Sequence, residues 1–393
     1  MNRIKITLRS YDYILILAVI AVGVFGVLMV YSFGNATSTP FGISSWAPSL
    51  WRRQIIYIVS GTVIMVAISF IDYRIITRFF VYIYILMIML LIVAMITGVD
   101  DGTGVARWIW IPVPIPGVDR LSLQPSEFSK LFMTLFLAKF LDVKKDTFNK
   151  IWWLGLLLIL ILVPVILVER QPSLSASLVV LTISLIVLFV GGLYYRTIII
   201  GLGLVAPIFA FIWLDLRREV PAFLPRVLNT FQWERIETWL DPQMGSDAFR
   251  QTQQSLAAIS AGGLTGRGFM NVSYVANGHN DFVFSLVAEQ FGFVGATVLL
   301  GAVVLIIARC ILIALRAQDI QGRLIATGVA GMIIFETFVH VSVATNFLPN
   351  TGMPFPFVSF GGSMIWVHML AIGVVLNVKI PREKSIFDDE DDR

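Results

Sequence analysis

The sequence has few of the residues from which soluble enzymes build metal, thiol or nucleotide sites. Its 393 residues include one cysteine, Cys310, and three histidines. One cysteine excludes an internal disulfide and a cluster of thiolate ligands, and the histidines are not spaced as metal ligands. No GxxxxGK[ST] motif occurs, so we expect no nucleotide hydrolysis. No metal centre built from protein ligands is predicted.

Charge is also scarce. Charged residues make up 14% of the chain, hydrophobic residues make up 57%, and the mean hydropathy is +0.84. This composition is typical of helices solvated by lipid. Apolar runs near the membrane-crossing length of about 20 residues lie at 12–32, 54–71, 79–97, 127–141, 152–168, 175–193, 198–214, 282–308, 324–346 and 363–380. The sequence therefore predicts an all-α integral membrane protein with about ten transmembrane helices.

The distribution of Lys and Arg predicts the orientation. A cytoplasmic N-terminus places 17 of the 29 Lys and Arg residues on the cytoplasmic side, and the short loops show the positive-inside bias. The C-terminus then also lies in the cytoplasm, and a large loop at about 215–281, between helices 7 and 8, faces outward. We predict one membrane domain over 1–380 and a disordered cytoplasmic tail over 381–393, where a run of acidic residues cannot pack against itself.

The large outer loop ends at Asp281, where an apolar helix begins. Asp281, Ser285 and Glu289 recur every four residues and share one helix face. Asp281 has two interpretations: a helix N-cap, or a general base that takes a proton from a substrate hydroxyl at the membrane surface. Glu289 lies roughly 12 Å deeper, at ~1.5 Å per residue. We expect a structural ion pair there, because burial disfavours an unpaired charge.

A second cluster follows the third predicted span. Prolines at alternate positions of 112–116 favour an extended loop. Glu127 and Lys130 lie three residues apart at the start of the next helix, and a Glu–Lys pair is the simpler interpretation. The alternative is a cationic patch of Arg107 and Lys130 for an anionic headgroup, because a planar guanidinium suits phosphate oxygens.

Two further segments are candidates for ligand contact. In the large loop, Gln254 and Ser255 precede an apolar stretch and a glycine-rich turn that contains Arg267, and we expect an amphipathic segment on the membrane surface. Between the last two spans, 348–363 is rich in proline and glycine, and irregular backbone at membrane depth is tolerated where it lines a cavity. We therefore predict that this segment forms a groove wall. Its polar side chains include Thr351 and Ser359.

These clusters, in this order, resemble the SEDS family (shape, elongation, division and sporulation), and the resemblance covers nearly the whole chain. The specific stretches are Asp281-Phe-Val-Phe with Glu289, the run 254–268, and 349–363. Glu127 and Lys130 match the family motif Gln-Pro-x-Glu-x-x-Lys, and Arg107 matches its Arg-Trp motif.

The resemblance implies a peptidoglycan glycosyltransferase that polymerises lipid II at the outer face of the bacterial plasma membrane. Its implied partner is a class B penicillin-binding protein that crosslinks the product, and no nucleic-acid partner is expected. The family's essential aspartate falls on Asp281, which favours catalysis over capping.

The implied mechanism needs no nucleotide, because lipid II carries its sugar on a diphosphate. Asp281 would deprotonate the 4-hydroxyl of the acceptor N-acetylglucosamine, which attacks C1 of the donor N-acetylmuramic acid with inversion. The cations that could stabilise the departing diphosphate are Arg107, Lys130, Arg170, Arg235 and Arg267. A divalent cation, Mg²⁺ or Mn²⁺, is a further candidate for stabilising the departing diphosphate.

Four positions depart from the family pattern. Ser173 and Ser175 stand where family members often have a carboxylate and a glycine, Gln290 replaces the second Glu of a Glu-Glu pair, and His340 stands where an amide is common. These differences bear on the subgroup, whether elongation, division or sporulation, and on the choice of partner.

Two other functions are also compatible with the sequence. A lipid II flippase is supported by Glu336 and His340, four residues apart in the ninth span, and by Glu289, because intramembrane titratable groups often mark transport paths. A structural role explains the same residues. The third interpretation is a scaffold without activity that binds its transpeptidase partner through the proline-rich segment 108–118.

Overall fold

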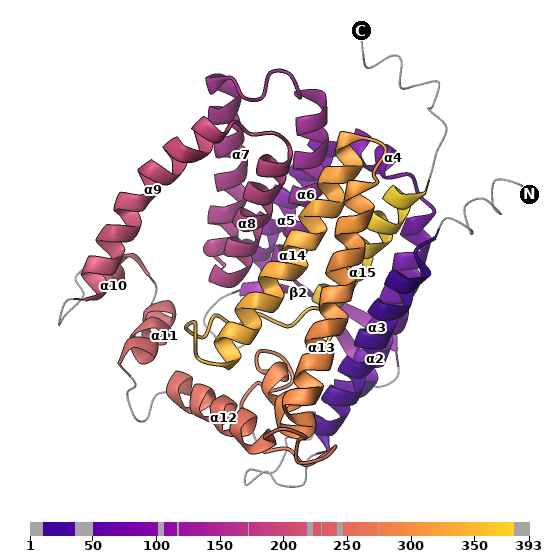
Figure 1. Cartoon of the computed structure of the whole chain (residues 1–393), viewed down its shortest axis with the longest axis vertical. Helices are drawn as coiled ribbons and strands as arrows, with labels where there is room; N and C mark the ends of the chain where they lie inside the picture. The colour runs from indigo at the N-terminus through magenta and orange to yellow at the C-terminus, as the bar shows by residue number, and fades with distance from the viewer. Residues whose placement is uncertain are drawn as a thin grey trace, which may run out of the picture.

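The computed structural model describes residues 11–35, 50–100, 106–115, 118–171, 173–217, 223–228, 230–241, 247–273 and 275–380. The predicted tail at 381–393 lies outside these residues. Helices dominate the fold (Figure 1). They are α2 (Tyr13–Gly34), α3 (Leu50–Ser69), α4 (Tyr73–Arg78), α5 (Phe80–Thr97), α6 (Pro125–Val143), α7 (Ile151–Glu169), α8 (Leu174–Val190), α9 (Tyr195–Leu216), α10 (Leu224–Val227), α11 (Thr230–Leu240), α12 (Asp247–Gly262), α13 (Val283–Leu315), α14 (Ile320–Ala344) and α15 (Gly362–Lys379).

The helices confirm the predicted class of integral membrane protein. Within the described residues, eight helices are long and apolar enough to cross a bilayer: α2, α3, α5, α7, α9, α13, α14 and α15. The apolar helix α8 is shorter, and α6 is more polar but lies inside the bundle. Ten crossings, the number predicted from the sequence, would need both α6 and α8 in addition, and that count stays a prediction.

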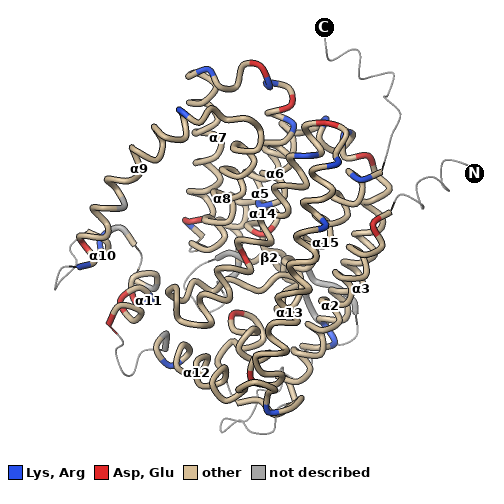
Figure 2. The backbone as a smooth tube through the Cα atoms, in the orientation of Figure 1, with Lys and Arg blue, Asp and Glu red and all other residues tan. Residues whose placement is uncertain are grey.

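Side-chain exposure follows the membrane assignment. Large apolar side chains face outward along the helices, such as Leu17 at 66% exposed and Ile96 at 77%. A water-soluble protein rarely shows apolar surface on that scale. Charged residues gather at helix ends and on α10 to α12, which leaves long uncharged stretches between them (Figure 2).

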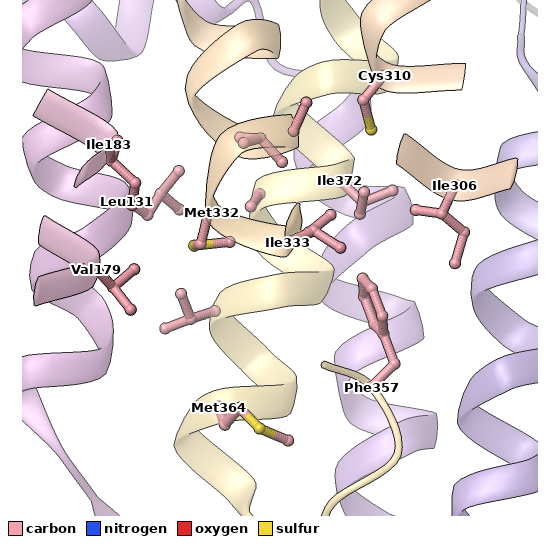
Figure 3. Close-up of a cluster of buried hydrophobic side chains, with 14 of the residues drawn as sticks. Leu131, Val179, Ile183, Ile306, Cys310, Met332, Ile333, Phe357, Met364 and Ile372 are labelled. Atoms are coloured by element: carbon pink, nitrogen blue, oxygen red, sulfur yellow. The ribbon is translucent and has the colours of Figure 1, made fainter. Parts of the chain in front are cut away.

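The core lies around α14 and α15. In the most apolar stretches of these two helices, 72% and 83% of residues are buried, compared with none in α9. Side chains from α6, α8, α13, α14 and α15 meet in the interior, where Leu131, Ile183, Met332 and Ile372 form part of one cluster (Figure 3). The helix α9 stands apart from this bundle on its outer side (Figure 1).

The proline-rich segment forms a small antiparallel sheet of β1 (Val99–Asp100), β2 (Ala106–Ile115) and β3 (Val118–Leu123). The extended backbone agrees with the predicted extended loop. The pairing of its strands was not predicted, so the fold is mainly α-helical with one small sheet. Ile109 pairs with Leu123, and Trp110 pairs with Ser122. The Ser363 hydroxyl fastens the sheet to the start of α15, because it donates to the Ser122 carbonyl (2.9 Å) and accepts from the backbone N–H of Gln124 (2.8 Å).

At the end of the bundle away from the sheet, an ionic cluster joins α2, α13 and α15. Asp12 caps α2 through the Leu15 N–H (3.1 Å) and accepts from Arg309 of α13 (Nε, 3.1 Å) and from Lys379 of α15 (Nζ, 3.1 Å). Burial acts to raise the pKa of Asp12, but its donors hold that pKa below the ordinary value. The start of α2 and the end of α15 therefore lie together.

Candidate functional site

Asp281 lies in the turn before α13 and does not cap that helix. The helix begins at Val283, and Phe282 occupies the N-cap position without a side-chain cap. The Asp281 N–H donates to the Asn277 carbonyl (3.0 Å), and Asp281 itself is half-buried. The capping interpretation therefore does not explain this carboxylate.

Asp281 and Arg235 converge on the backbone of Gly352. A Cβ atom added to Gly352 would lie 3.5 Å from Asp281 Oδ2 and 3.4 Å from Arg235 Nη1. Gly352 has a φ of +67°, a conformation that other residues rarely adopt. Arg235 Nη1 also donates to the Asn350 carbonyl (3.1 Å). Three segments thus bring an acid and a guanidinium together: α11, the 349–352 stretch, and the turn before α13.

The 348–361 segment is held against the Asp281 turn by hydrogen bonds. The Ser359 hydroxyl donates to the Asn280 carbonyl (2.6 Å) and accepts from the Phe355 N–H (2.8 Å). The Phe360 N–H donates to the His279 carbonyl (2.9 Å). Ser359 is fully buried, so it positions the turn instead of facing a ligand as predicted.

Thr351 is a better candidate for ligand contact than Ser359. Its Oγ1 is buried and has no hydrogen-bond partner within the described part of the chain. Buried hydroxyls are normally paired, so a lone one on the residue before Gly352 is notable. Asn350 beside it is engaged: its Oδ1 accepts from the Gly352 N–H (3.1 Å), and its Nδ2 donates to Gln251 (3.0 Å).

Gln254 and Ser255 fasten the outer helix α12 to the bundle. Gln254 Oε1 accepts from the Ala276 N–H (3.0 Å), and the Ser255 hydroxyl contacts the hydroxyl of Ser285 (2.6 Å) and the Ala344 carbonyl (2.7 Å). The predicted amphipathic segment is therefore helical, but its inner face packs on α13 and α14 and not on a membrane surface. Both side chains serve this packing in place of the predicted substrate contact.

Glu289 has the ionic partner that its burial requires. Its carboxylate accepts from Arg267 Nη1 (3.0 Å), from the Ser273 hydroxyl (2.6 Å) and from the Ser273 N–H (2.9 Å). Arg267 is 49% exposed at its side chain, whereas Glu289 is fully buried. This ion pair links the glycine-rich turn to α13, and the Glu289 carboxylate neutralises the charge of Arg267.

The same turn supplies hydrogen-bond partners at a break in α13. Gly292 has φ +65° and ψ −164°, which interrupts the helix. The N–H groups of Phe293 and Val294 donate to the carbonyls of Gly263 and Leu264 (2.9 and 3.1 Å), and the Arg267 N–H donates to the Glu289 carbonyl (2.9 Å). Backbone groups that the break leaves unpaired therefore bond to the turn.

Lys130 belongs to a buried ion network, which departs from its predicted role in a phosphate-binding patch. Its ammonium is 2.8 Å from both Glu127 oxygens and 2.7 Å from Glu336 Oε1, and Glu336 Oε2 is 2.6 Å from His368 Nε2. Each of these side chains is at most 6% exposed. An ammonium with three carboxylate contacts in the interior cannot reach a headgroup, so the simpler Glu–Lys interpretation describes the structure.

His340 and Glu336 have separate partners, although they lie four residues apart. His340 Nδ1 is 2.7 Å from the Met353 carbonyl, and its Nε2 accepts from the Phe284 N–H (3.3 Å). One ring nitrogen donates and the other accepts, as the two ends of an amide would. His340 can therefore make the two hydrogen bonds that an amide would make, and Glu336 and His340 do not pair with each other.

Gln290 is also explained by its partners. Its Oε1 accepts from the Ser32 hydroxyl (2.6 Å) and the Met270 N–H (3.0 Å), while its Nε2 donates to the Leu286 carbonyl (3.2 Å). A carboxylate lacks the amide donor that bonds to the Leu286 carbonyl. The other two departures, Ser173 and Ser175, are buried at the start of α8, and their contacts do not explain the change.

The remaining predicted cations are placed differently. Arg170 is exposed at the end of α7, and Arg107 lies in β2 with its side chain outside the described residues. Arg235 is the predicted cation that the structure brings to Asp281.

Sequence reasoning missed the residues that join these groups. Gly352, Asn350 and His368 were not singled out, although Asn350-Thr351-Gly352 is a typical turn sequence that could have located the meeting point.

A pocket opens beside the Asp281 site. It is partly open to solvent and lies between α11, α12 and the residues that follow α14. Arg235 and Asn350 belong both to this pocket and to the Gly352 junction. In the part of the chain that the structure describes, no three His, Cys, Asp or Glu residues are grouped to hold a metal ion. The protein therefore supplies no complete set of metal ligands there.

Comparison with known proteins places this geometry in context. A family model for cell cycle proteins of the FtsW, RodA and SpoVE type matches residues 12–384. The probable peptidoglycan glycosyltransferase FtsW of Trichlorobacter lovleyi is 30% identical over 381 residues, covering 94% of this chain and 93% of its own. The peptidoglycan glycosyltransferase MrdB of Escherichia coli K12 is 31% identical over 380 residues, covering 95% and 94%.

A solved structure has the same fold. One chain of a peptidoglycan synthase complex, described as coordinating polymerization and crosslinking, superposes with a TM-score of 0.74 at 29% identity. The match covers 94% of this chain and 97% of that one.

Proposed function

This chain belongs to the SEDS family of cell-wall glycosyltransferases, and from that premise we propose that it polymerises lipid II with Asp281 as the general base. It is a multi-pass membrane protein of peptidoglycan synthesis. The observation that carries the assignment of Asp281 is its meeting with Arg235 at Gly352, beside an open pocket. The active site in this proposal faces the outside of the bacterial plasma membrane, and both termini are cytoplasmic.

The reaction transfers a glycosyl group in one displacement. Asp281 accepts the proton of the acceptor's 4-hydroxyl as that oxygen attacks C1 of the donor sugar, and the C1–oxygen bond to the diphosphate breaks. The diphosphate leaves with the bonding electron pair, and the configuration at C1 inverts. Asp281 then releases its proton to solvent. A half-buried carboxylate at the outer mouth of α13 can exchange protons with water between turnovers.

Arg235 is the first choice for screening the departing diphosphate, because its guanidinium lies at the same glycine as the base. Arg170 is exposed and remains a second candidate. Lys130 and Glu127 have another role in this proposal: their buried network with Glu336 holds α6 against α14 behind the site.

We propose a class B penicillin-binding protein as the partner that crosslinks the new strand. The support is the likeness to a chain from a complex whose description joins polymerization and crosslinking. The partner would receive the strand on the outer side, where α10 to α12 lie.

The test compares Asp281→Asn with Asp241→Asn in purified protein supplied with lipid II. Asp241 is exposed at the end of α11, so the control makes the same chemical change in the same outer region. Loss of a general base lowers the rate by about 10²–10⁴-fold. We expect that loss for Asp281→Asn and wild-type polymerisation for Asp241→Asn.

Wild-type polymerisation by Asp281→Asn would overturn the assignment of the base. Liposomes add a second arm: movement of labelled lipid II across the bilayer without lengthening would overturn the polymerase function itself and favour a flippase.

A further inference from the structure

The first turn of α13 is capped by a side chain from another helix. The N–H groups at a helix start have no acceptor within the helix, and Phe282 at the N-cap position has an apolar side chain that cannot accept from them. His340 of α14 takes this role, because its Nε2 accepts from the Phe284 N–H at 3.3 Å. The helix start that follows Asp281 is therefore fixed to α14.

The other nitrogen of the same ring bonds to the segment that contains Gly352. His340 Nδ1 is 2.7 Å from the Met353 carbonyl, one residue after the glycine that lies against Asp281. A carbonyl can only accept, so Nδ1 carries the proton, and Nε2 keeps the lone pair to which Phe284 donates. Both contacts thus require one state of the ring, the neutral imidazole with its proton on Nδ1.

Burial fixes the ring in this position. His340 is fully buried, and the ring of Phe355 packs against it edge to face, with centroids 5.2 Å apart. Loss of either hydrogen bond would leave a buried polar atom without that partner, which folded proteins avoid. The imidazole therefore acts as a rigid spacer between the start of α13 and the stretch around Met353.

We propose that His340 is a positioning residue for glycosyl transfer, which sets the placement of Asp281 relative to the backbone at Gly352. The inference rests on the proposed function, because it takes Asp281 as the base. The Phe284 N–H lies three residues after that base, and the Met353 carbonyl lies one residue after the glycine. A misplacement of about 1 Å can lower the rate of a reaction by about 100-fold, so a spacer at this point affects the chemistry.

The kinetic test removes both hydrogen bonds and then restores them with an amide. His340→Leu keeps a buried apolar side chain without either nitrogen, and His340→Gln supplies one donor and one acceptor. With purified protein and lipid II, we expect His340→Leu to lower kcat by about 10- to 100-fold and to leave KM nearly unchanged, because His340 acts on the base and not on substrate binding. His340→Gln should restore most of the lost kcat.

Asp12→Asn is the matched control for loss of stability. Asp12 is buried at the other end of the bundle, where its substitution weakens the contacts to Arg309 and Lys379. At an assay temperature below the thermal midpoint of every variant, Asp12→Asn should keep the wild-type kcat. Equal loss of kcat in Asp12→Asn and His340→Leu would mean that the rate only follows stability, and it would overturn the proposal.

The state of the ring provides a measurement that does not depend on turnover. The chain has three histidines, His279, His340 and His368, so nitrogen NMR of histidine-labelled protein in lipid bilayers can resolve their rings. The signal that is missing from His340→Gln identifies His340. At neutral pH we expect a neutral ring protonated on Nδ1. A proton on Nε2 would set a donor against the Phe284 N–H and contradict the proposed spacer.

The outcomes separate this inference from the proposed function. Wild-type polymerisation by His340→Leu, while Asp281→Asn is inactive, would remove the positioning role and leave the base in place. The role would also fail if His340→Gln were as slow as His340→Leu, or if the loss appeared in KM alone. Wild-type polymerisation by Asp281→Asn would instead overturn the proposed function, whatever the His340 variants do.

Discussion

At the scale of single residues, burial decides which polar side chains are structural and which are available for chemistry. Lys130, Glu289, Gln290 and His340 are buried and have partners for the groups that they present. Asp281 is half-buried, and Thr351 Oγ1 lacks a partner within the described residues. A buried hydroxyl without a partner in the protein, such as that of Thr351, is normally completed by a ligand or by water.

Lys130→Met should destabilise the protein strongly. The substitution leaves Glu127 and Glu336 facing each other in the interior without their shared cation, and breaking a buried ion pair costs about 3–5 kcal/mol. Thermal unfolding in detergent measures the effect, with Lys145→Met as the control because Lys145 is exposed. A Lys130→Met protein as stable as wild type would contradict the described network.

Gln290→Glu replaces the amide by a carboxylate and should destabilise the protein. The Leu286 carbonyl would lose the side-chain donor and face a carboxylate oxygen, at a cost of about 1–3 kcal/mol. The measurement is the thermal midpoint of unfolding, compared between wild type and variant at neutral pH. An unchanged or higher midpoint would mean that the amide is not required.

At the scale of elements, the break in α13 is the feature that orients the segment bearing Asp281. The helical stretch 283–291 follows Asp281 directly and ends at Gly292, where the glycine-rich turn supplies backbone partners. The Arg267–Glu289 ion pair adds an ionic contact at the same point. The direction of this half-helix is thus set by a loop that lies about 20 to 30 residues earlier in the chain.

Gly292→Ala and Gly301→Ala form a matched pair on this helix. At Gly292 a Cβ would lie 2.4 Å from the Gly266 nitrogen and φ is +65°, whereas at Gly301 a Cβ would meet no atom within 4 Å. We expect Gly292→Ala to lose at least about 1–3 kcal/mol through strain. It should also lower polymerisation.

Gly301→Ala should change stability by less than about 1 kcal/mol, because alanine is a good helix former. Thermal unfolding and the lipid II assay on both variants are the measurements. Equal behaviour of the two would contradict a role for the break.

At the scale of the whole molecule, ionic contacts join elements that are far apart in the sequence. Asp12 links the first described helix, α2, to α13 and α15 through Arg309 and Lys379. The carboxylate site lies near the start of α13 and the Asp12 cluster near its end. The 23 residues of α13 that follow the break at Gly292 span about 35 Å at ~1.5 Å per residue, enough to cross the hydrocarbon core of a bilayer.

The Asp12 cluster should make stability depend on acid pH. The pKa of Asp12 is lowered in the folded protein, so its contribution is fully present above its ordinary value of 3.8 and is lost as pH falls through the lowered pKa. Asp12→Asn should therefore reduce the thermal midpoint at pH 7, and the difference from wild type should shrink in strong acid.

Asp146→Asn is the control for this measurement, because Asp146 is exposed. A difference between wild type and Asp12→Asn that stays constant down to the lowest pH would contradict this account.

Much of the architecture was predictable from composition and periodicity alone. Long apolar runs can be stable in a bilayer only as helices, because every backbone group must bond within its own segment. The sequence also located Asp281 and the segments 254–268 and 349–363, since glycine, proline and acid residues stand out against an apolar background. Pairing was less predictable: Lys130 with Glu336, and Gly352 with Asp281, are contacts between residues over 70 positions apart.

The sequence by itself determined the membrane class, the approximate spans and the carboxylate at a helix mouth, because hydropathy and local backbone preferences act over short stretches of chain. Only the tertiary structure decided which neighbours each predicted cation has. Lys130 and Arg267 are neutralised by carboxylates from other parts of the chain, while Arg235 reaches Asp281 across a glycine. The physical reason is that the availability of a charge depends on its neighbours in space, and packing chooses those neighbours.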